Sequence, residues 1–172
     1  MRETDDTARQ INEELARRHS TATVLFHHAV AERLGLGPAD HKCLDLLLER
    51  GTMTGSELAA ATGLTTGAIT GVVARLERDG RIRREPHPDD GRKQVLRPVP
   101  EGLRDLQDVF AGIGAETGPL LDGFDDRELR AIAEYLRRST DFARRHAALL
   151  RVATITAGAS GTPTNGEADD QH

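Results

Sequence analysis

Hydroxyl and guanidinium side chains gather between Leu64 and Arg97, where their spacing suits contact with a nucleic acid. This segment holds eight basic and five acidic residues, so it carries a net charge of +3 while the rest of the chain carries −8. Arginine can bind phosphate or fork onto guanine, and threonine can reach phosphates or base edges. A solvated charged face would have the same local charge, so charge alone leaves both interpretations open.

A helix from Thr65 to about Asp79 would sort these side chains onto two faces. At about 100° per residue, an apolar stripe that we expect to pack inward lies on one face: Ile69, Val72, Val73 and Leu76. The opposite face carries small residues and arginines: Gly67, Gly71, Ala74 and Arg78, flanked by Thr66, Thr70 and Arg75. Small residues allow this face to approach either a DNA groove or another helix closely.

A stiff hairpin is predicted after Gly80. Two short runs, 81–85 and 93–97, flank a stretch that contains Pro86, Pro88 and Gly91, and such a pattern indicates two paired strands with a turn. An arginine at the tip, Arg92, would suit insertion into a narrow minor groove. The alternative interpretation is an ordinary surface turn.

Helices on both sides must position this segment. Apolar spacing predicts helices over 7–34, 38–50, 101–121 and 126–151. A short helix over 55–61 begins at a capping box formed by Thr54 and Glu57. Because Gly63 separates this helix from the next, the pair has the pattern of a helix-turn-helix.

The composition favours one helical domain in the cytoplasm. Aromatic residues make up 3% of the 172 residues, so the core must come from Leu, Val, Ile and Ala. Cys43 stands alone and cannot form an internal disulfide, and residues 1–18 lack the apolar run of a signal peptide. No stretch approaches the roughly 20 apolar residues of a membrane span. We therefore expect no membrane role.

The chain resembles the MarR family of bacterial winged-helix regulators at two motifs. Asp90-Gly91-Arg92 matches the Asp-x-Arg element of the family's wing, and residues 76–84 match the Leu-x-x-x-Gly-x-x-x-Arg stretch before it. The resemblance covers roughly residues 8–151. It implies a mainly α fold: a winged helix-turn-helix with a two-stranded wing, and an N- and C-terminal helical dimerisation region.

The resemblance also implies a division of the chain. A single domain over 1–155 would contain a DNA-binding lobe at about 36–98 and dimerisation helices at about 7–34 and 100–151. The remaining segment, 156–172, is small and polar, and we expect it to be disordered.

Individual residues receive expected roles from the same resemblance. The residues expected to face the major groove are Thr65, Thr66, Gly67, Thr70 and Arg75. Arg92 would enter the minor groove, while Asp90 would orient Arg92 or brace the wing. Arg84 would support the wing base or touch phosphate, and Thr54 and Lys93 complete the predicted DNA contacts. Gly71 departs from the family, because many relatives carry a long polar side chain there.

The predicted function is sequence-specific regulation of transcription, as a repressor in our preferred interpretation. The resemblance implies a homodimer that would bind a pseudo-palindromic site in double-stranded DNA and be released by a small-molecule effector. The apolar stripes of the terminal helices could instead pack within one chain. The alternative function is a winged-helix module that binds protein without DNA.

Three histidines and the cysteine are the candidates for effector sensing: His27, His28, His41 and Cys43. Neighbouring His27 and His28 point about 100° apart on a helix, and His41 and Cys43 diverge by about 200°, although one residue from each pair could converge. We expect no metal and no cofactor, and we interpret Cys43 as a small buried hydrophobic residue. Without a glycine-rich phosphate loop, a nucleophile elbow or a catalytic carboxylate pair, we predict that the protein is not an enzyme.

Overall fold

The computed structural model describes residues 2–159 and opens on a long helical segment. This segment consists of α1 (Arg2–Gln10), a π-helical stretch η1 (Ile11–Leu15) and α2 (Ala16–Arg33). It begins before the predicted start at Thr7 and ends one residue before Leu34. Gly35 follows with φ of +65°, a left-handed conformation that suits glycine and ends the helix.

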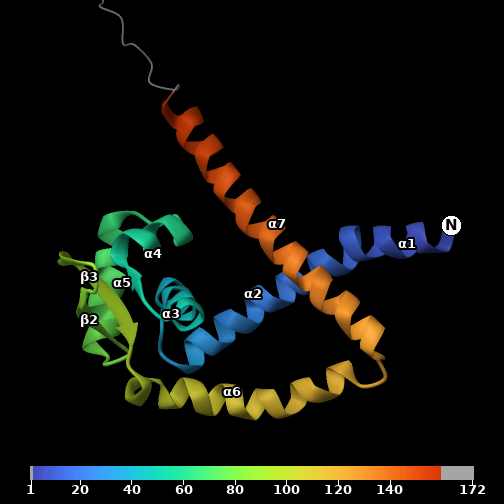
Figure 1. Ribbon diagram of the computed structural model, residues 1–172, viewed down its shortest axis with the longest axis horizontal. Helices are drawn as coiled ribbons and strands as arrows, with labels where there is room; N and C mark the ends of the chain where they lie inside the picture. Colours follow the sequence, from blue (N-terminus) through green and yellow to red (C-terminus); the bar gives the residue numbers. More distant parts are fainter. Residues whose placement is uncertain (1, 160–172) are drawn as a thin grey trace, which may run out of the picture. The chain divides into compact units, whose positions relative to one another are not determined.

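Three helices build the helix-turn-helix lobe: α3 (Pro38–Arg50), α4 (Gly55–Thr62) and α5 (Thr66–Arg78) (Figure 1). Pro38 stands in the first turn of α3, as predicted. The axes of α4 and α5 are bent by 116° at the intervening turn, within the range of DNA-binding helix-turn-helix motifs. This confirms the predicted motif.

A three-stranded antiparallel sheet completes the lobe. The strands β1 (Met53–Thr54), β2 (Ile82–His87) and β3 (Asp90–Pro98) lie in the order β1-β3-β2. The predicted hairpin is therefore confirmed as β2 and β3. The prediction of only two strands was incomplete, because β1 pairs Met53 with Leu96 and Thr54 with Val95. A strand of two residues is too short to show an alternating pattern.

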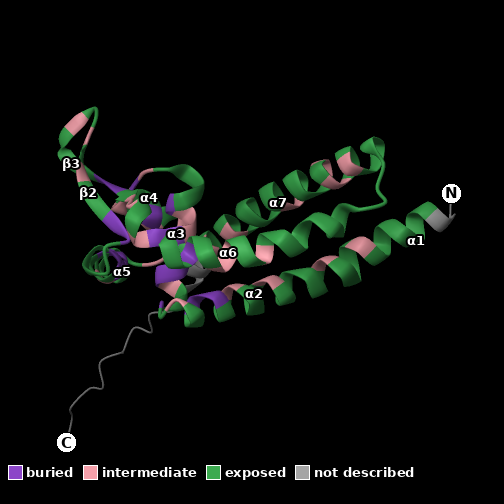
Figure 2. Ribbon diagram, turned by 90° about the horizontal axis from the view of Figure 1, so that it is seen from below, coloured by how far each residue is buried: buried purple, intermediate pink, exposed green. Residues whose placement is uncertain are grey.

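The core of the chain lies in this lobe. All four residues of the predicted inward stripe on α5 are buried, with exposures of 3% or less. They pack in one cluster with buried residues of the neighbouring elements, which include Leu44, Leu47, Leu58, Ile82 and Leu96. Figure 2 shows this concentration of buried residues in α3, α5 and the adjoining sheet, whereas most of α2 is exposed.

A tight backbone junction connects the lobe to the next helix. After β3 the chain forms η2 (Pro100–Leu103) and α6 (Arg104–Thr117). A β-carbon on Gly102 would lie 2.1 Å from the carbonyl oxygen of Gly80, so only glycine fits without displacement. The buried guanidinium of Arg81 donates two hydrogen bonds to the Asp105 carboxylate, at 2.9 and 2.7 Å. Backbone contact and ion pair together hold the start of α6 against the end of α5.

The chain divides into two compact units, Met1–Glu116 and Thr117–His172. The single domain predicted for residues 1–155 therefore spans both units. The second contains η3 (Gly118–Leu121) and α7 (Asp126–Ala159). A capping box stands before α7, because Asp125 and Glu128 exchange two hydrogen bonds of 2.8 Å. α7 continues past the predicted end at Arg151 to Ala159, so the prediction of disorder was wrong for residues 156–159. The rest of that predicted tail, 160–172, lies outside the described residues.

Candidate nucleic-acid interface

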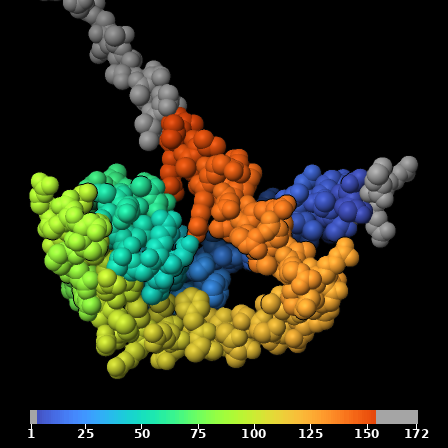
Figure 3. Space-filling view, viewed as in Figure 1, coloured from blue at the N-terminus to red at the C-terminus, as the bar shows by residue number. Residues whose placement is uncertain are grey.

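A shallow groove separates the start of α5 from the wing. It has a volume of about 590 Å³, and four of the predicted DNA contacts line it: Thr54, Thr66, Thr70 and Lys93. The helix α4 and the wing form neighbouring parts of the lobe surface (Figure 3). Sequence reasoning missed Ser56, His87 and Gln94, which also line the groove. Ser56 follows the cap of α4 and could have been found from that position.

The first turn of α5 offers an open, polar surface. Thr65 caps the helix, because its Oγ1 accepts a hydrogen bond from the amide of Ala68 at 3.2 Å. Thr70 is exposed, and its Oγ1 donates to the carbonyl oxygen of Thr66 at 2.9 Å. A β-carbon on Gly67 would meet no atom within 4 Å. The positive end of the helix dipole is thus accessible, and such an end favours phosphate.

Thr54 contributes mainly to the local structure of α4. Its backbone N–H donates to Glu57 Oε2 at 2.6 Å, and its Oγ1 accepts from the Glu57 amide at 3.2 Å. This confirms the predicted capping box. Hydrogen bonds from the Thr54 backbone and side chain hold the pKa of Glu57 below its ordinary value, so the carboxylate remains charged at the start of the helix.

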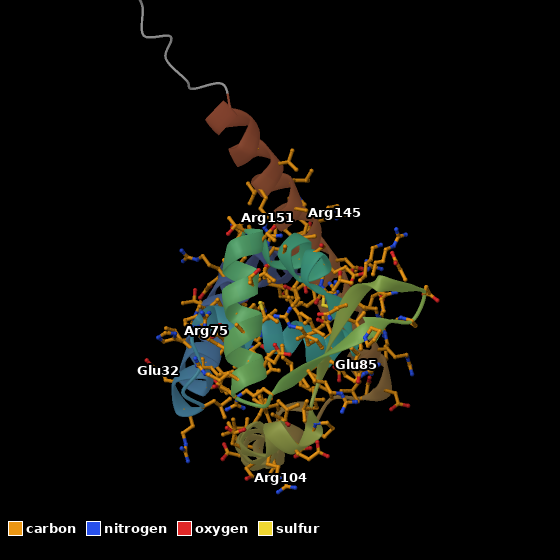
Figure 4. The ribbon with its side chains drawn as sticks, turned by 90° about the vertical axis from the view of Figure 1, so that its left-hand side faces the viewer. Glu32, Arg75, Glu85, Arg104, Arg145 and Arg151 are labelled. Atoms are coloured by element: carbon orange, nitrogen blue, oxygen red, sulfur yellow. The ribbon has the colours of Figure 1, made fainter. Side chains whose placement is uncertain are left out.

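Arg75 is committed to an ion pair within the lobe. Its Nε and Nη2 donate to the two carboxylate oxygens of Asp40 on α3, at 2.8 and 2.6 Å. Asp40 is buried, with 4% of its surface exposed. The Nε and Nη2 groups of Arg75, labelled on α5 in Figure 4, are therefore already bonded to Asp40, and a two-pronged contact to guanine would need such a pair of donors. Its expected major-groove contact stays a prediction.

Gly71 lies beside the guanidinium of Arg75. A β-carbon at position 71 would lie 3.3 Å from Arg75 Nη1, closer than ordinary van der Waals contact. A longer side chain there would crowd the guanidinium. The lack of a side chain at position 71 thus leaves room for the pairing of α5 with α3.

The wing tip presents Arg92 to solvent. The side chain of Arg92 is 96% exposed, and its Nε lies 3.5 Å from Asp90 Oδ1. The same Asp90 oxygen accepts a hydrogen bond from the Arg92 amide at 3.2 Å. Asp90 Oδ2 lies 3.6 Å from Lys93 Nζ. This arrangement is compatible with the expected role of Asp90 in orienting Arg92 and bracing the turn.

The arginines at the wing base are paired more closely. Arg84 Nε donates to Glu77 Oε2 on α5 at 3.1 Å, which fits its expected role as a support. Glu85, labelled in Figure 4, accepts from Arg97 at 2.7 Å and from Arg83 at 2.6 Å, and these hydrogen bonds hold its pKa below the ordinary value. Arg92 and Lys93 at the tip are therefore more exposed than the paired arginines at the wing base.

Two of the three candidate effector histidines meet between α2 and α3. His27 and His41 line a hollow of about 350 Å³, and their rings are 5.5 Å apart. Asp45, absent from the sequence predictions, lies between them, although its spacing of four residues from His41 could have identified it. His28 also borders the hollow but directs its Nε2 to Glu32, at 3.3 Å.

Cys43 lies on α3 and is fully buried. Burial raises the pKa of its thiol to about 11, so the group stays protonated near neutral pH. The interpretation of Cys43 as a small buried hydrophobic residue is confirmed.

Together these features define a winged helix-turn-helix protein, and comparison with known proteins identifies its family. A model of the MarR family matches residues 36–93. The uncharacterized HTH-type transcriptional regulator YcgE of Bacillus subtilis is 39% identical over 128 residues, which cover 74% of this chain and 83% of YcgE. MhqR of the same bacterium, also an HTH-type transcriptional regulator, is 28% identical over 60% of this chain and 72% of its own length. The chain belongs to the MarR family of transcriptional regulators.

Solved structures agree with the fold. A MarR family protein from Bacillus stearothermophilus superposes with a TM-score of 0.60 at 22% identity, covering 81% of this chain and 96% of that protein. The transcriptional regulator Tm0710 from Thermotoga maritima gives 0.56 at 23% identity, over 81% of this chain and 98% of its own. No single helix in residues 2–159 has both the length and the apolar character to cross a membrane. The helices α4 and α5, taken together as a bent pair, are long and apolar enough, but they supply core residues of the lobe.

Proposed function

We propose that this protein is a sequence-specific DNA-binding repressor that acts as a homodimer on a pseudo-palindromic site. One observation carries the proposal: the open N-terminal face of α5 and the exposed Arg92 border the same lobe, with a groove between helix and wing. A recognition helix fits the major groove of B-DNA, which is about 12 Å wide. An arginine beside it can enter the neighbouring minor groove.

Dimerisation is supported by apolar side chains that the terminal helices leave exposed. On α2, Val24 and Leu25 are 66% and 64% exposed. The exposed apolar residues of α7 are Tyr135, Leu136, Phe142, Leu149, Leu150 and Val152. Burial of such residues stabilises a protein by about 1.5–3 kcal/mol each. A second copy of the chain would bury these side chains, and a twofold axis would present two DNA-binding lobes to the DNA.

An effector would release the dimer from DNA only if it bound more tightly to one arrangement of the two DNA-binding lobes than to another. The hollow bordered by His27, His28 and His41 is our proposed effector site, because it joins α2 to the first helix of the lobe. We also infer that the protein acts in the cytoplasm and has no catalytic activity, since its curated relatives are transcriptional regulators.

Selection of bound sequences from random duplex DNA tests the proposal. We expect two half-sites one helical turn apart, with binding that weakens steeply as salt is raised, because neutralised phosphates release counterions. Binding that is flat between low and moderate salt contradicts the proposal. A stoichiometric complex with a protein, without retention of DNA, would favour the protein-binding alternative.

Variants on the selected site separate the predicted roles. Arg92→Ala should weaken binding, most strongly at A·T-rich flanks, and should reduce the salt slope by about 1. Thr70→Val should change the preference at one base position. Arg138→Ala is the matched control, because Arg138 is an exposed arginine of α7 paired with Glu134. Equal binding by the wild type and the Arg92→Ala/Thr70→Val double variant would disprove these assignments.

Self-association is tested by sedimentation. Leu25→Asp should weaken the dimer at least about tenfold, because a carboxylate would have to be desolvated at the interface. Ser20→Asp is the control, since it places the same charge at an exposed position of α2 that lies about 140° around the helix from Leu25. A wild-type protein that remains monomeric at micromolar concentration is incompatible with the dimer.

A further inference from the structure

Three potential metal ligands converge where α2 packs against α3. His27 comes from α2, and His41 and Asp45 stand one turn apart on α3. Asp45 Oδ2 lies 3.6 Å from His27 Nδ1 and 3.5 Å from His41 Nδ1. One donor atom from each residue lies within 4.8 Å of the other two. The three donors thus face one small volume.

The spacing of the donors matches a metal site better than a set of direct hydrogen bonds. Nitrogen and oxygen ligands of a tetrahedral zinc ion lie about 2.0–2.1 Å from the metal, so neighbouring donors are about 3.4 Å apart. The separations of 3.6 and 3.5 Å from Asp45 Oδ2 are close to this value. They exceed the roughly 2.7–3.2 Å of a good N–H···O hydrogen bond.

The polar atoms at this position are also incompletely satisfied within the protein. His27 Nδ1 is buried and has no hydrogen-bond partner among the described residues, and the same is true of His41 Nε2. Buried polar groups without partners are uncommon in folded proteins. A cation held at Nδ1 of His27 would satisfy one of them.

We propose that His27, His41 and Asp45 bind a divalent first-row transition metal ion such as Zn²⁺. Two imidazoles and one carboxylate are typical ligands of this class of ion, and the set leaves a fourth position open for water or another ligand. The site revises the sequence-based expectation that the chain holds no metal. Asp45 supplies a ligand that lies outside both pairs considered from the sequence, His27/His28 and His41/Cys43.

A bound ion would cross-link two parts of the first unit. His27 belongs to the long N-terminal helix, whereas His41 and Asp45 belong to the first helix of the lobe. The ion would therefore fix the orientation of α2 relative to α3. A regulatory use of this link rests on the proposed function, because it requires that the lobe bind DNA; binding of the ion does not.

Cobalt(II) is the probe for the experiment, because tetrahedral Co²⁺ absorbs visible light and is displaced by Zn²⁺. The full-length protein should bind one Co²⁺ per chain at this site with visible absorption, and competition against a chelator gives the Zn²⁺ affinity. His27→Ala and Asp45→Asn should each lower that affinity by at least about tenfold. Both positions are partly exposed, and circular dichroism checks that the variants remain folded.

His28→Ala is the matched control. It removes the neighbouring histidine, whose Nε2 lies near Glu32 rather than Asp45, and it should retain wild-type affinity. Equal loss in all three variants, equal retention in all three, or absence of binding by the wild type would overturn the proposal.

A second measurement separates the site from its use. Zn²⁺ should change the DNA affinity of the wild type and leave that of His27→Ala unchanged. If the protein binds Zn²⁺ at these residues but binds no DNA, the proposed function fails and the metal site stands. If it binds DNA but no metal, the reverse holds.

Discussion

The lobe and the long helices differ in how many of their apolar side chains are buried. α3, α4 and α5 surround a continuous core in which Leu44, Leu47 and Leu58 are fully buried. Along α2, buried side chains occur only at Val30 and Ala31, and the described side chains of α7 (126–153) include none that is buried. The lobe carries its own stabilising interactions, whereas the long helices leave large apolar side chains exposed.

The difference indicates where each part of the function can change. Substitution inside the lobe is limited by close packing, and exposed apolar patches such as those of the helices often mark interaction surfaces. The predictions that follow test this contrast.

The largest effect is expected for Leu44→Ala. Removal of this fully buried side chain should lower the free energy of unfolding by about 2–5 kcal/mol, measured by urea denaturation. Leu25→Ala makes the same change at a residue that is 64% exposed, and it should cost much less at low protein concentration. Equal losses would remove the contrast between lobe and helix.

Two glycines near α6 should respond in opposite directions. Gly102→Ala forces a β-carbon to within 2.1 Å of the Gly80 oxygen, and we expect it to lower stability by about 1–3 kcal/mol. Gly112→Ala lies in the open on α6 and should raise stability by about 0.5–1 kcal/mol, because alanine favours helix. Thermal denaturation measures both. A stable Gly102→Ala variant would show that the junction is not tightly packed.

Arg75 tests whether the recognition helix is part of the packed lobe. Arg75→Met should destabilise the fold, because it leaves the buried Asp40 carboxylate unpaired. Adding Asp40→Asn should recover part of the loss, and a double-mutant cycle in urea measures the coupling. If Arg75→Met weakens DNA binding without affecting stability, Arg75 serves the interface instead.

The smallest effect concerns acid stability at the base of the lobe. Hydrogen bonds from Arg81 hold the pKa of Asp105 below its ordinary value. The resulting stabilisation is fully present above that ordinary value, near pH 4, and is lost as pH falls through the lower folded-state pKa. The wild type should therefore lose more stability on acidification below about pH 4 than Asp105→Asn does. Parallel acid titrations of the two proteins would contradict this.

Local patterns predicted much of the fold. Capping boxes, glycine stops and the period of apolar residues located the helices, because these signals act over a few residues. The hairpin followed from prolines and charged runs. The short strand β1 could not be found in this way, since its pairing with β3 joins residues more than 40 positions apart.

The candidate DNA-binding surface was predicted less completely than the helices, because some of its contacts join residues far apart in the sequence. Thr66, Thr70 and Lys93 could be placed from their spacing on α5 and the wing. The pairing of Arg75 with Asp40 joins residues 35 positions apart, and no helical wheel of α5 reports it. The meeting of His27 with Asp45 likewise depends on how two helices pack.

The strand β1 links the wing to the helix-turn-helix through Thr54. Thr54 pairs with β3 and also caps α4, so one residue belongs to both the wing sheet and the helix-turn-helix. Wing and helices are therefore joined before any ligand arrives. We expect the lobe to bind DNA as one preorganised body, which would lose little conformational entropy on binding.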